Sequence, residues 1–353
     1  MILPKFHCFL GLGLLLLGAG TAAPAESVKV WVDTETCGKY DGLQDAIRKA
    51  FDRVSIRAYY ARNAMYCRDC APVEATVRNI LGTDDLDKRV SNVQSTLKLV
   101  EELAGKEFSK AKSREDWSKV AMPNDITIYC SLDHLQDYNA IEETLEDKAL
   151  RRICPKSSDP LAFEARKPGT RIAMITGSHV PCVKERRLSG FDTAPEYIAF
   201  TDTYRNTLHD QPNWGLLASD AYDSHHAGDA DWVEAQLRKM AGDDYDRLKD
   251  TLTPMDTLSS LEHLIFHELM HTAACGHLVH GRYDAALWKV ITNLKITKID
   301  PSKNNEAIAL LAHALEMMTR LEYRTSSEGY VFEEDSRVGI PDYIPPPAGL
   351  SWD

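Results

Sequence analysis

Two histidines four residues apart, with a glutamate directly after the first, stand in the segment His267-Glu268-Leu269-Met270-His271. On a helix, side chains at positions i and i+4 lie on one face, so both imidazoles can bind the same zinc ion. Glu268 would then project beside the metal and accept a proton from a zinc-bound water. The spacing therefore predicts a Zn²⁺ site with His267 and His271 as metal ligands and Glu268 as the catalytic base.

The residues around this segment predict a buried helix that begins shortly before it. Asp256 or Thr257 can cap the start of the helix, and Gly276 suits its C-terminal end. Apolar residues at helical spacing form the side away from the metal, at Leu258, Leu261, Ile265 and Leu269.

A catalytic zinc takes three protein ligands and keeps one position open for water, so a third ligand must lie outside the helix. His277 stands ten residues after His267, which is the metzincin spacing, although Ala274 occupies the position where that pattern has glycine. Glu306 could act as a ligand from a later helix, as in gluzincins. Asp284 is the third candidate. His263, one turn before the motif, is expected to support the site rather than to bind the metal.

Gly281 and Asp284 match a pattern, Gly-Thr-x-Asp-x-x-Tyr-Gly, that follows the zinc helix in one family, and Asn304-Asn305-Glu306-Ala307 is similar to a helix start found later in it. Over residues 257–318 the chain thus resembles the deuterolysin-type metalloendopeptidases of fungi, the aspzincins, and lysine-specific metalloendopeptidase-like domains. The resemblance implies that Asp284 is the third zinc ligand. It also implies an oxyanion-stabilising tyrosine, but this chain has Leu287 at that position.

The N-terminus predicts export. Lys5 precedes an apolar run from Phe9 to Leu17, and small residues follow up to Ala25. This is the pattern of a secretory signal peptide that is cleaved after about Ala23 or Ala25, and the apolar run is short for a membrane span. We therefore expect a secreted, extracellular protein.

Seven of the eight cysteines lie beyond the signal peptide, and an odd number leaves at least one thiol unpaired. In an oxidising compartment we expect Cys67 and Cys70 to be ordinary disulfide partners, because no second Cys-x-x-Cys completes a zinc ribbon. Cys275, one turn past His271, is the expected unpaired residue.

The formal net charge is −12, and cleavage of the signal peptide would remove Lys5 and no acidic residue. This acidity argues against nucleic acid and anionic membranes as partners. We expect a monomer that acts on peptide or protein substrates.

The predicted fold class is α+β, a mostly helical zincin-type metallopeptidase domain with a small antiparallel or mixed sheet before the zinc helix. One domain is expected over residues 26–335, between the signal peptide at 1–25 and a proline-rich tail at 336–353. Helices are predicted over 43–60, 86–103 and 304–320, and strands over 125–130, 171–176 and 197–201.

These features predict a secreted zinc metalloendopeptidase. Leu287 in place of the tyrosine leaves an alternative open, a secreted binding protein or effector on a peptidase scaffold with weakened or lost activity.

Overall fold

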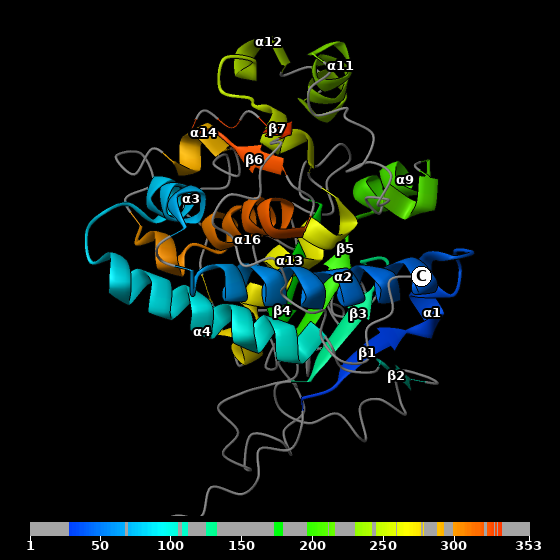
Figure 1. Ribbon diagram of the computed structural model, residues 1–353. Helices are drawn as coiled ribbons and strands as arrows, with labels where there is room; N and C mark the ends of the chain where they lie inside the picture. The colour runs from blue at the N-terminus through cyan, green and yellow to red at the C-terminus, as the bar shows by residue number, and fades with distance from the viewer. Residues whose placement is uncertain are drawn as a thin grey trace, which may run out of the picture.

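A computed structural model gives the arrangement of the chain (Figure 1). It describes residues 28–67, 70–104, 108–111, 125–132, 173–178, 196–210, 212–215, 230–241, 245–258, 260–276, 278, 288–292, 299–320, 323–327, 329 and 331–333. The expected signal peptide and the proline-rich tail lie outside these residues.

A five-stranded mixed sheet precedes the helix that carries the histidine motif. Its strand order is β2-β1-β3-β5-β4, with β4 antiparallel to β5 and the other neighbours parallel. The chain is therefore α+β with a mixed sheet, which confirms the predicted α+β class. The strands are β1 (Val30–Asp33), β2 (Phe108–Ala111), β3 (Ile126–Tyr129), β4 (Met174–Ser178) and β5 (Glu196–Phe200).

Alternate side chains of the central strands enter different parts of the core. Ile198 and Phe200 of β5 join the main hydrophobic core with the helices, whereas Tyr197 and Ala199 pack with Tyr129 in a separate cluster. Every residue of β3 and β5 is buried, as is usual for parallel strands that are covered on both faces.

Long helices pack beside one another and against the sheet (Figure 1). Helix α13, which carries the histidine motif, contacts α2, α4, α16 and β4, so it lies inside the molecule. The helices of this layer are α2 (Leu43–Ala64), α3 (Ala71–Leu81), α4 (Leu86–Ala104), α13 (Leu261–His271) and α16 (Asn305–Arg320).

Shorter elements connect and flank these layers. They are the α-helices α1 (Thr34–Cys37), α9 (Asp202–His209), α11 (Ala230–Ala241), α12 (Tyr245–Leu248) and α14 (Trp288–Ile291), the 3-10 helices η4 (Pro212–Gly215), η7 (Pro254–Leu258), η8 (Ala273–Cys275) and η9 (Pro301–Lys303), and the hairpin of β6 (Tyr323–Thr325) and β7 (Val331–Glu333).

The predicted long helices are confirmed, and all three predicted strands are present within a few residues of the expected bounds. The expected cap of the zinc helix is wrong. Ser260, not Asp256 or Thr257, accepts a hydrogen bond from the backbone N–H of His263, because η7 ends before α13 begins. The α-helix also stops at His271, and Gly276, with φ of 101°, ends the 3-10 turn that follows.

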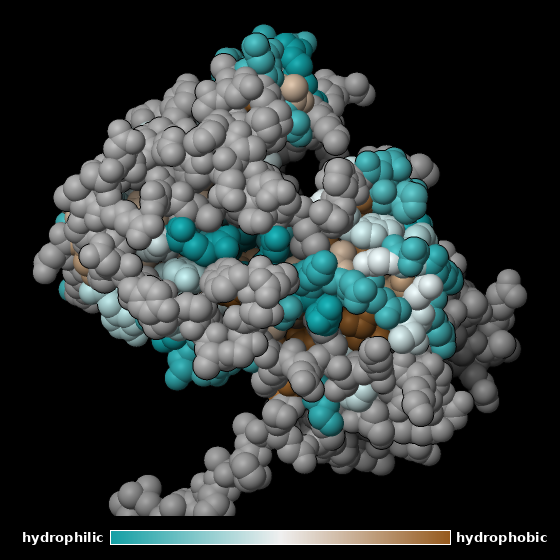
Figure 2. All heavy atoms as spheres, turned by 45° about the vertical axis from the view of Figure 1, so that its right-hand side comes forward, coloured by the Kyte–Doolittle hydropathy of each residue, from teal (hydrophilic) through white to brown (hydrophobic). Residues whose placement is uncertain are grey.

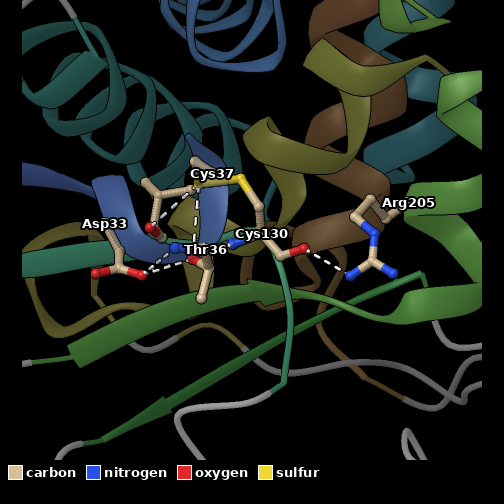
Figure 3. Close-up of a disulfide and its surroundings, with 6 residues drawn as sticks. Asp33, Thr36, Cys37, Cys130 and Arg205 are labelled. Atoms are coloured by element: carbon tan, nitrogen blue, oxygen red, sulfur yellow. Dashed lines mark hydrogen bonds between the residues drawn. A yellow bond between two sulfur atoms is a disulfide. The ribbon is translucent and has the colours of Figure 1, made fainter. Parts of the chain in front are cut away.

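Two disulfides lie within the described residues. Cys37 and Cys130 join the end of α1 to the residue after β3, and Cys67 pairs with Cys70. Figure 3 shows the first disulfide, where Arg205 donates to the Cys130 carbonyl at 3.2 Å. Cys275 is free and buried, as expected. Burial raises the pKa of its thiol to about 12, so the thiol is neutral at physiological pH.

Described residues on the surface are mainly hydrophilic on the face drawn in Figure 2. Among the described residues, the exposed large hydrophobic side chains are Tyr66 and Leu99. No helix in the described part of the chain has the length and apolar character to cross a membrane.

Candidate metal centre

Helix α13 fixes the histidine motif inside the molecule. Nine of its eleven residues are buried, including His267 and Glu268. The helix ends at His271 because Thr272 is extended and its hydroxyl donates to the carbonyl of Leu269 at 2.6 Å. The motif therefore stands on a capped helix in the core.

The imidazoles of His267 and His271 converge at one point. Their Nε2 atoms lie 2.9 and 2.7 Å from the side-chain nitrogen of Asn305, the first residue of α16. The ring centroids are 5.1 Å apart. Two imidazoles on adjacent turns thus direct their Nε2 atoms toward the same small volume, as a shared metal ion requires.

The opposite nitrogens of both rings have acceptor partners. Nδ1 of His267 is hydrogen-bonded to the carboxylate of Glu306, and Nδ1 of His271 donates to the backbone carbonyl of Leu278 at 2.8 Å. Carboxylates and backbone carbonyls are the usual partners of metal-binding histidines, because they hold the proton on Nδ1 and leave the Nε2 lone pair for the metal. The two histidines therefore fit a zinc ion.

Glu306 contacts His267 on the Nδ1 edge of the ring, away from Nε2. Its second oxygen lies 3.2 Å from Nε2 of His263, and its backbone N–H donates to Asn304. Burial alone would favour a neutral carboxyl, but His267 and His263 outweigh it and hold the pKa of Glu306 well below its usual range. Burial opposes the charge on His267, yet Glu306 raises the pKa of that imidazole.

Glu268 contacts the edge strand of the sheet. The hydroxyl of Thr176 on β4 donates to a carboxylate oxygen of Glu268 at 2.5 Å and lies 3.2 Å from its backbone carbonyl oxygen. This contact ties the carboxylate to β4, because a short hydrogen bond to a charged oxygen is stronger than one between neutral groups. Strand β4 therefore lies beside the expected catalytic base.

A buried ionic cluster underlies the helix on the side of α2. Arg57, which is 2% exposed, pairs with Glu316 of α16 at 2.8 Å and with Glu262 of α13 at 4.0 Å. Arg53 pairs with Glu262 at 3.6 Å. These ion pairs fix the relative positions of α2, α13 and α16, the last two of which hold the histidines and their carboxylate partner.

Two of the third-ligand candidates, His277 and Asp284, lie outside the described residues, as does Leu287. The N–H of Leu278 donates to Met270 at 2.9 Å, and the N–H of Trp288 donates to Asp256 at 2.8 Å. Within the described part of the chain, no group of three His, Cys, Asp or Glu side chains is arranged to hold a metal ion.

Glu306, the remaining candidate, lies at Nδ1 of His267 rather than beside the converging Nε2 atoms. Nε2 of His263 contacts Glu306, and its supporting role stays a prediction. Three contributors were not predicted: Thr176, Asn305 and the carbonyl of Leu278. Thr176 ends a predicted strand and Asn305 stands near the start of a predicted helix, whereas a backbone carbonyl leaves no signal in the residue type.

Comparisons with protein-family models, with curated proteins and with solved structures find no match to this chain.

Proposed function

We propose that the protein is a secreted zinc metalloendopeptidase with a zincin-type active site. The observation that carries the proposal is the convergence of the Nε2 atoms of His267 and His271, each ring being held by an acceptor at its Nδ1 atom. A buried pair of histidines with this orientation and a glutamate beside it has the arrangement that hydrolytic zinc sites use.

His267 and His271 would hold the ion, and Asp284 remains the favoured third ligand on the strength of the family resemblance. Zinc bound there would supply Lewis-acid chemistry, acidifying a water and polarising the scissile carbonyl. Glu268 takes the proton from the attacking water and passes it to the leaving amine. Thr176 keeps the Glu268 carboxylate turned toward β4 through the hydrogen bond between their side chains.

Strand β4 is the proposed binding element for the substrate. It stands at one end of the strand order and is antiparallel to its only partner in the described sheet, β5. An extended peptide can add to such an edge by main-chain hydrogen bonds. Since Thr176 of β4 contacts Glu268, a peptide on this edge would lie beside the catalytic base.

Export is also part of the proposal. The N-terminal pattern of the sequence and the two disulfides, Cys37–Cys130 and Cys67–Cys70, are compatible with an oxidising compartment. N-terminal sequencing of the secreted mature chain after expression in a eukaryotic host would test it, and a mature N-terminus near residue 24 or 26 is the expected result.

The test of the activity compares the parent with Glu268→Gln on a protein substrate such as casein. Both proteins should bind zinc, whereas the variant should lose nearly all cleavage, because glutamine cannot accept the proton. Removal of zinc by a chelator should abolish cleavage by the parent, and added zinc should restore it. Equal cleavage by the two proteins would refute the mechanism.

The alternative, a binding protein with a degenerate peptidase site, has one specific observation in its favour, Leu287 in place of the family tyrosine. It predicts a parent protein that binds zinc through His267 and His271 but cleaves no peptide. Measuring zinc content and cleavage on the same preparation separates the two functions.

A further inference from the structure

Asn305 occupies the point where the two histidines converge. It is fully buried, and its side-chain nitrogen lies 2.9 Å from Nε2 of His267 and 2.7 Å from Nε2 of His271. The motif and the family resemblance assign no role to this side chain. Its nitrogen lies where a metal ion bound by both imidazoles would have to sit.

The hydrogen-bond chemistry identifies the atom of the amide that faces the histidines. The carbonyl of Leu278 can only accept, so Nδ1 of His271 carries the hydrogen and Nε2 of the neutral ring is an acceptor. The neutral form of His267 with its hydrogen toward Glu306 has the same arrangement. Two acceptors require two donors, and the amide nitrogen of Asn305 has two hydrogens.

This arrangement leaves the amide oxygen of Asn305 without a hydrogen bond from the described part of the chain. Oδ1 of Asn305 is buried and has no hydrogen-bond partner among the described residues. A buried amide oxygen without a partner is unfavourable. The amide group of Asn305 thus donates to both imidazoles while its own oxygen has no described partner. This indicates that the two Nε2 lone pairs set the orientation of the amide.

We propose that Asn305 competes with the metal for His267 and His271: its N–H groups occupy both Nε2 lone pairs in the metal-free protein, and metal binding requires it to release them. This inference rests on the proposed zinc site. A lone pair that coordinates a cation cannot also accept a hydrogen bond, so the amide and the metal exclude one another. Asn305 therefore weakens metal binding and fixes the orientation of both imidazoles in the metal-free protein.

The competing group can be removed without disturbing the rest of the site. Glu306 and Leu278 hold the two rings by their Nδ1 atoms, so the rings keep their orientation when Asn305 is shortened. The start of α16 is also preserved, because Asn304 accepts the backbone N–H of Glu306. Alanine is the most favourable residue in a helix, so Asn305→Ala should fold.

The test is the zinc affinity of the full chain, measured by competition with a chromogenic chelator in mildly alkaline buffer. Loss of two hydrogen bonds that oppose binding should make Asn305→Ala bind zinc about tenfold more tightly than the parent, and Asn305→Asp, which cannot donate when ionised, should also bind more tightly. Asn92→Ala is the matched control. Asn92 donates to Ser302 at 3.3 Å outside the site, so its replacement should leave the zinc affinity unchanged.

A second measurement follows the amide directly. In the ¹⁵N-edited NMR spectrum of the metal-free parent, the side-chain N–H pair that is missing from Asn305→Ala should exchange slowly with solvent. Zinc should shift this pair and speed its exchange. This readout does not depend on activity and needs only the parent and an assignment variant.

The outcomes separate this inference from the zinc site itself. If the parent binds zinc, and His267→Ala abolishes binding, but Asn305→Ala binds no more tightly, then Asn305 is no competitor and the inference fails alone. Weaker binding by Asn305→Ala would make Asn305 a metal ligand and would also overturn it. If the parent binds no zinc, the proposed function and the inference both fail.

Discussion

Thr176 on the edge strand β4 donates its hydroxyl hydrogen to Glu268 on helix α13, with 2.5 Å between the two oxygens. The contact joins the strand that would receive a peptide to the carboxylate that would move its protons. Since the two residues are far apart in the sequence, the contact depends on the packing of β4 against α13.

Replacing this hydroxyl should lower the rate of peptide hydrolysis. Thr176→Val keeps the size of the side chain but removes the donor, so the Glu268 carboxylate loses a hydrogen bond of about 1.5–3 kcal/mol and its fixed orientation. We expect kcat/KM to fall about tenfold or more, and Thr176→Ser to recover most of the loss. Thermal melts of the three proteins provide the control, and a Thr176→Val enzyme with parental kcat/KM would contradict the role.

The carboxylate behind His267 should control metal affinity. Glu306→Gln keeps a hydrogen-bond acceptor near Nδ1 of His267 but removes the negative charge that attracts the metal cation. Changes of this kind usually lower metal affinity about 10–100-fold, or about 1–3 kcal/mol. Chelator competition at equilibrium measures the effect. Glu102→Gln, at an exposed position of α4, is the matched control and should bind zinc as the parent does.

The buried ion pairs of Arg57 should be important for stability. Arg57→Met removes the most deeply buried partner of Glu316 and Glu262, which keep Arg320 and Arg53 as partners. Breaking such a buried pair typically destabilises a protein by about 3–5 kcal/mol. Arg78→Met is the matched control, since its pair with Glu74 is nearly half-exposed and should contribute less than about 1 kcal/mol. Urea unfolding of both variants measures the difference, and equal midpoints would refute the prediction.

Asp256 should give the protein an unusual pH dependence of stability. Burial raises the pKa of this carboxyl from 3.8 to about 6, against hydrogen bonds from Trp288 and Thr253 that lower it. Between these two pH values the folded protein therefore binds more protons than the unfolded chain. The contribution of Asp256 is present below about pH 4 and is lost as the pH rises toward 6, by roughly 3 kcal/mol.

The measurement compares the free energies of unfolding of the parent and Asp256→Asn at a series of pH values. The series runs from about pH 4 to 7, so that it spans the pKa values of 3.8 and about 6. The variant should be less stable at low pH, because asparagine cannot accept from both Trp288 and Thr253. The stability difference between parent and variant should shrink as the pH rises. A difference that stays constant over this range would refute the assigned pKa.

Much of the helical layer was predictable from the sequence, because helices such as α4 bury apolar residues at a 3.6-residue period. Strand β1 and helix α3 were not predicted. The parallel pairing of β1 with β2 and β3 joins segments that are far apart in the chain, so no local pattern records it.

In the site, too, local features were predictable from the sequence and contacts between distant segments were not. The spacing of His267, Glu268 and His271 predicts their common helix, since it is a local property of the chain. The roles of Glu306 and Asn305 were not predictable, because residue type indicates what a side chain can donate or accept but not which edge of an imidazole it meets. Only packing of α16 against α13 decides that Glu306 meets Nδ1 and Asn305 meets Nε2.

Leu278 orients His271 with its main-chain oxygen and fastens itself to α13 through its main-chain nitrogen. Evolution can therefore exchange the side chain at this position without touching either bond, with proline as the exception, because proline has no N–H. The two bonds themselves require no particular residue type here, although the side chain of Leu278 also packs against the core. The part of the site that holds His271 in place is thus invisible to any comparison of sequences and can be recognised only from the path of the backbone.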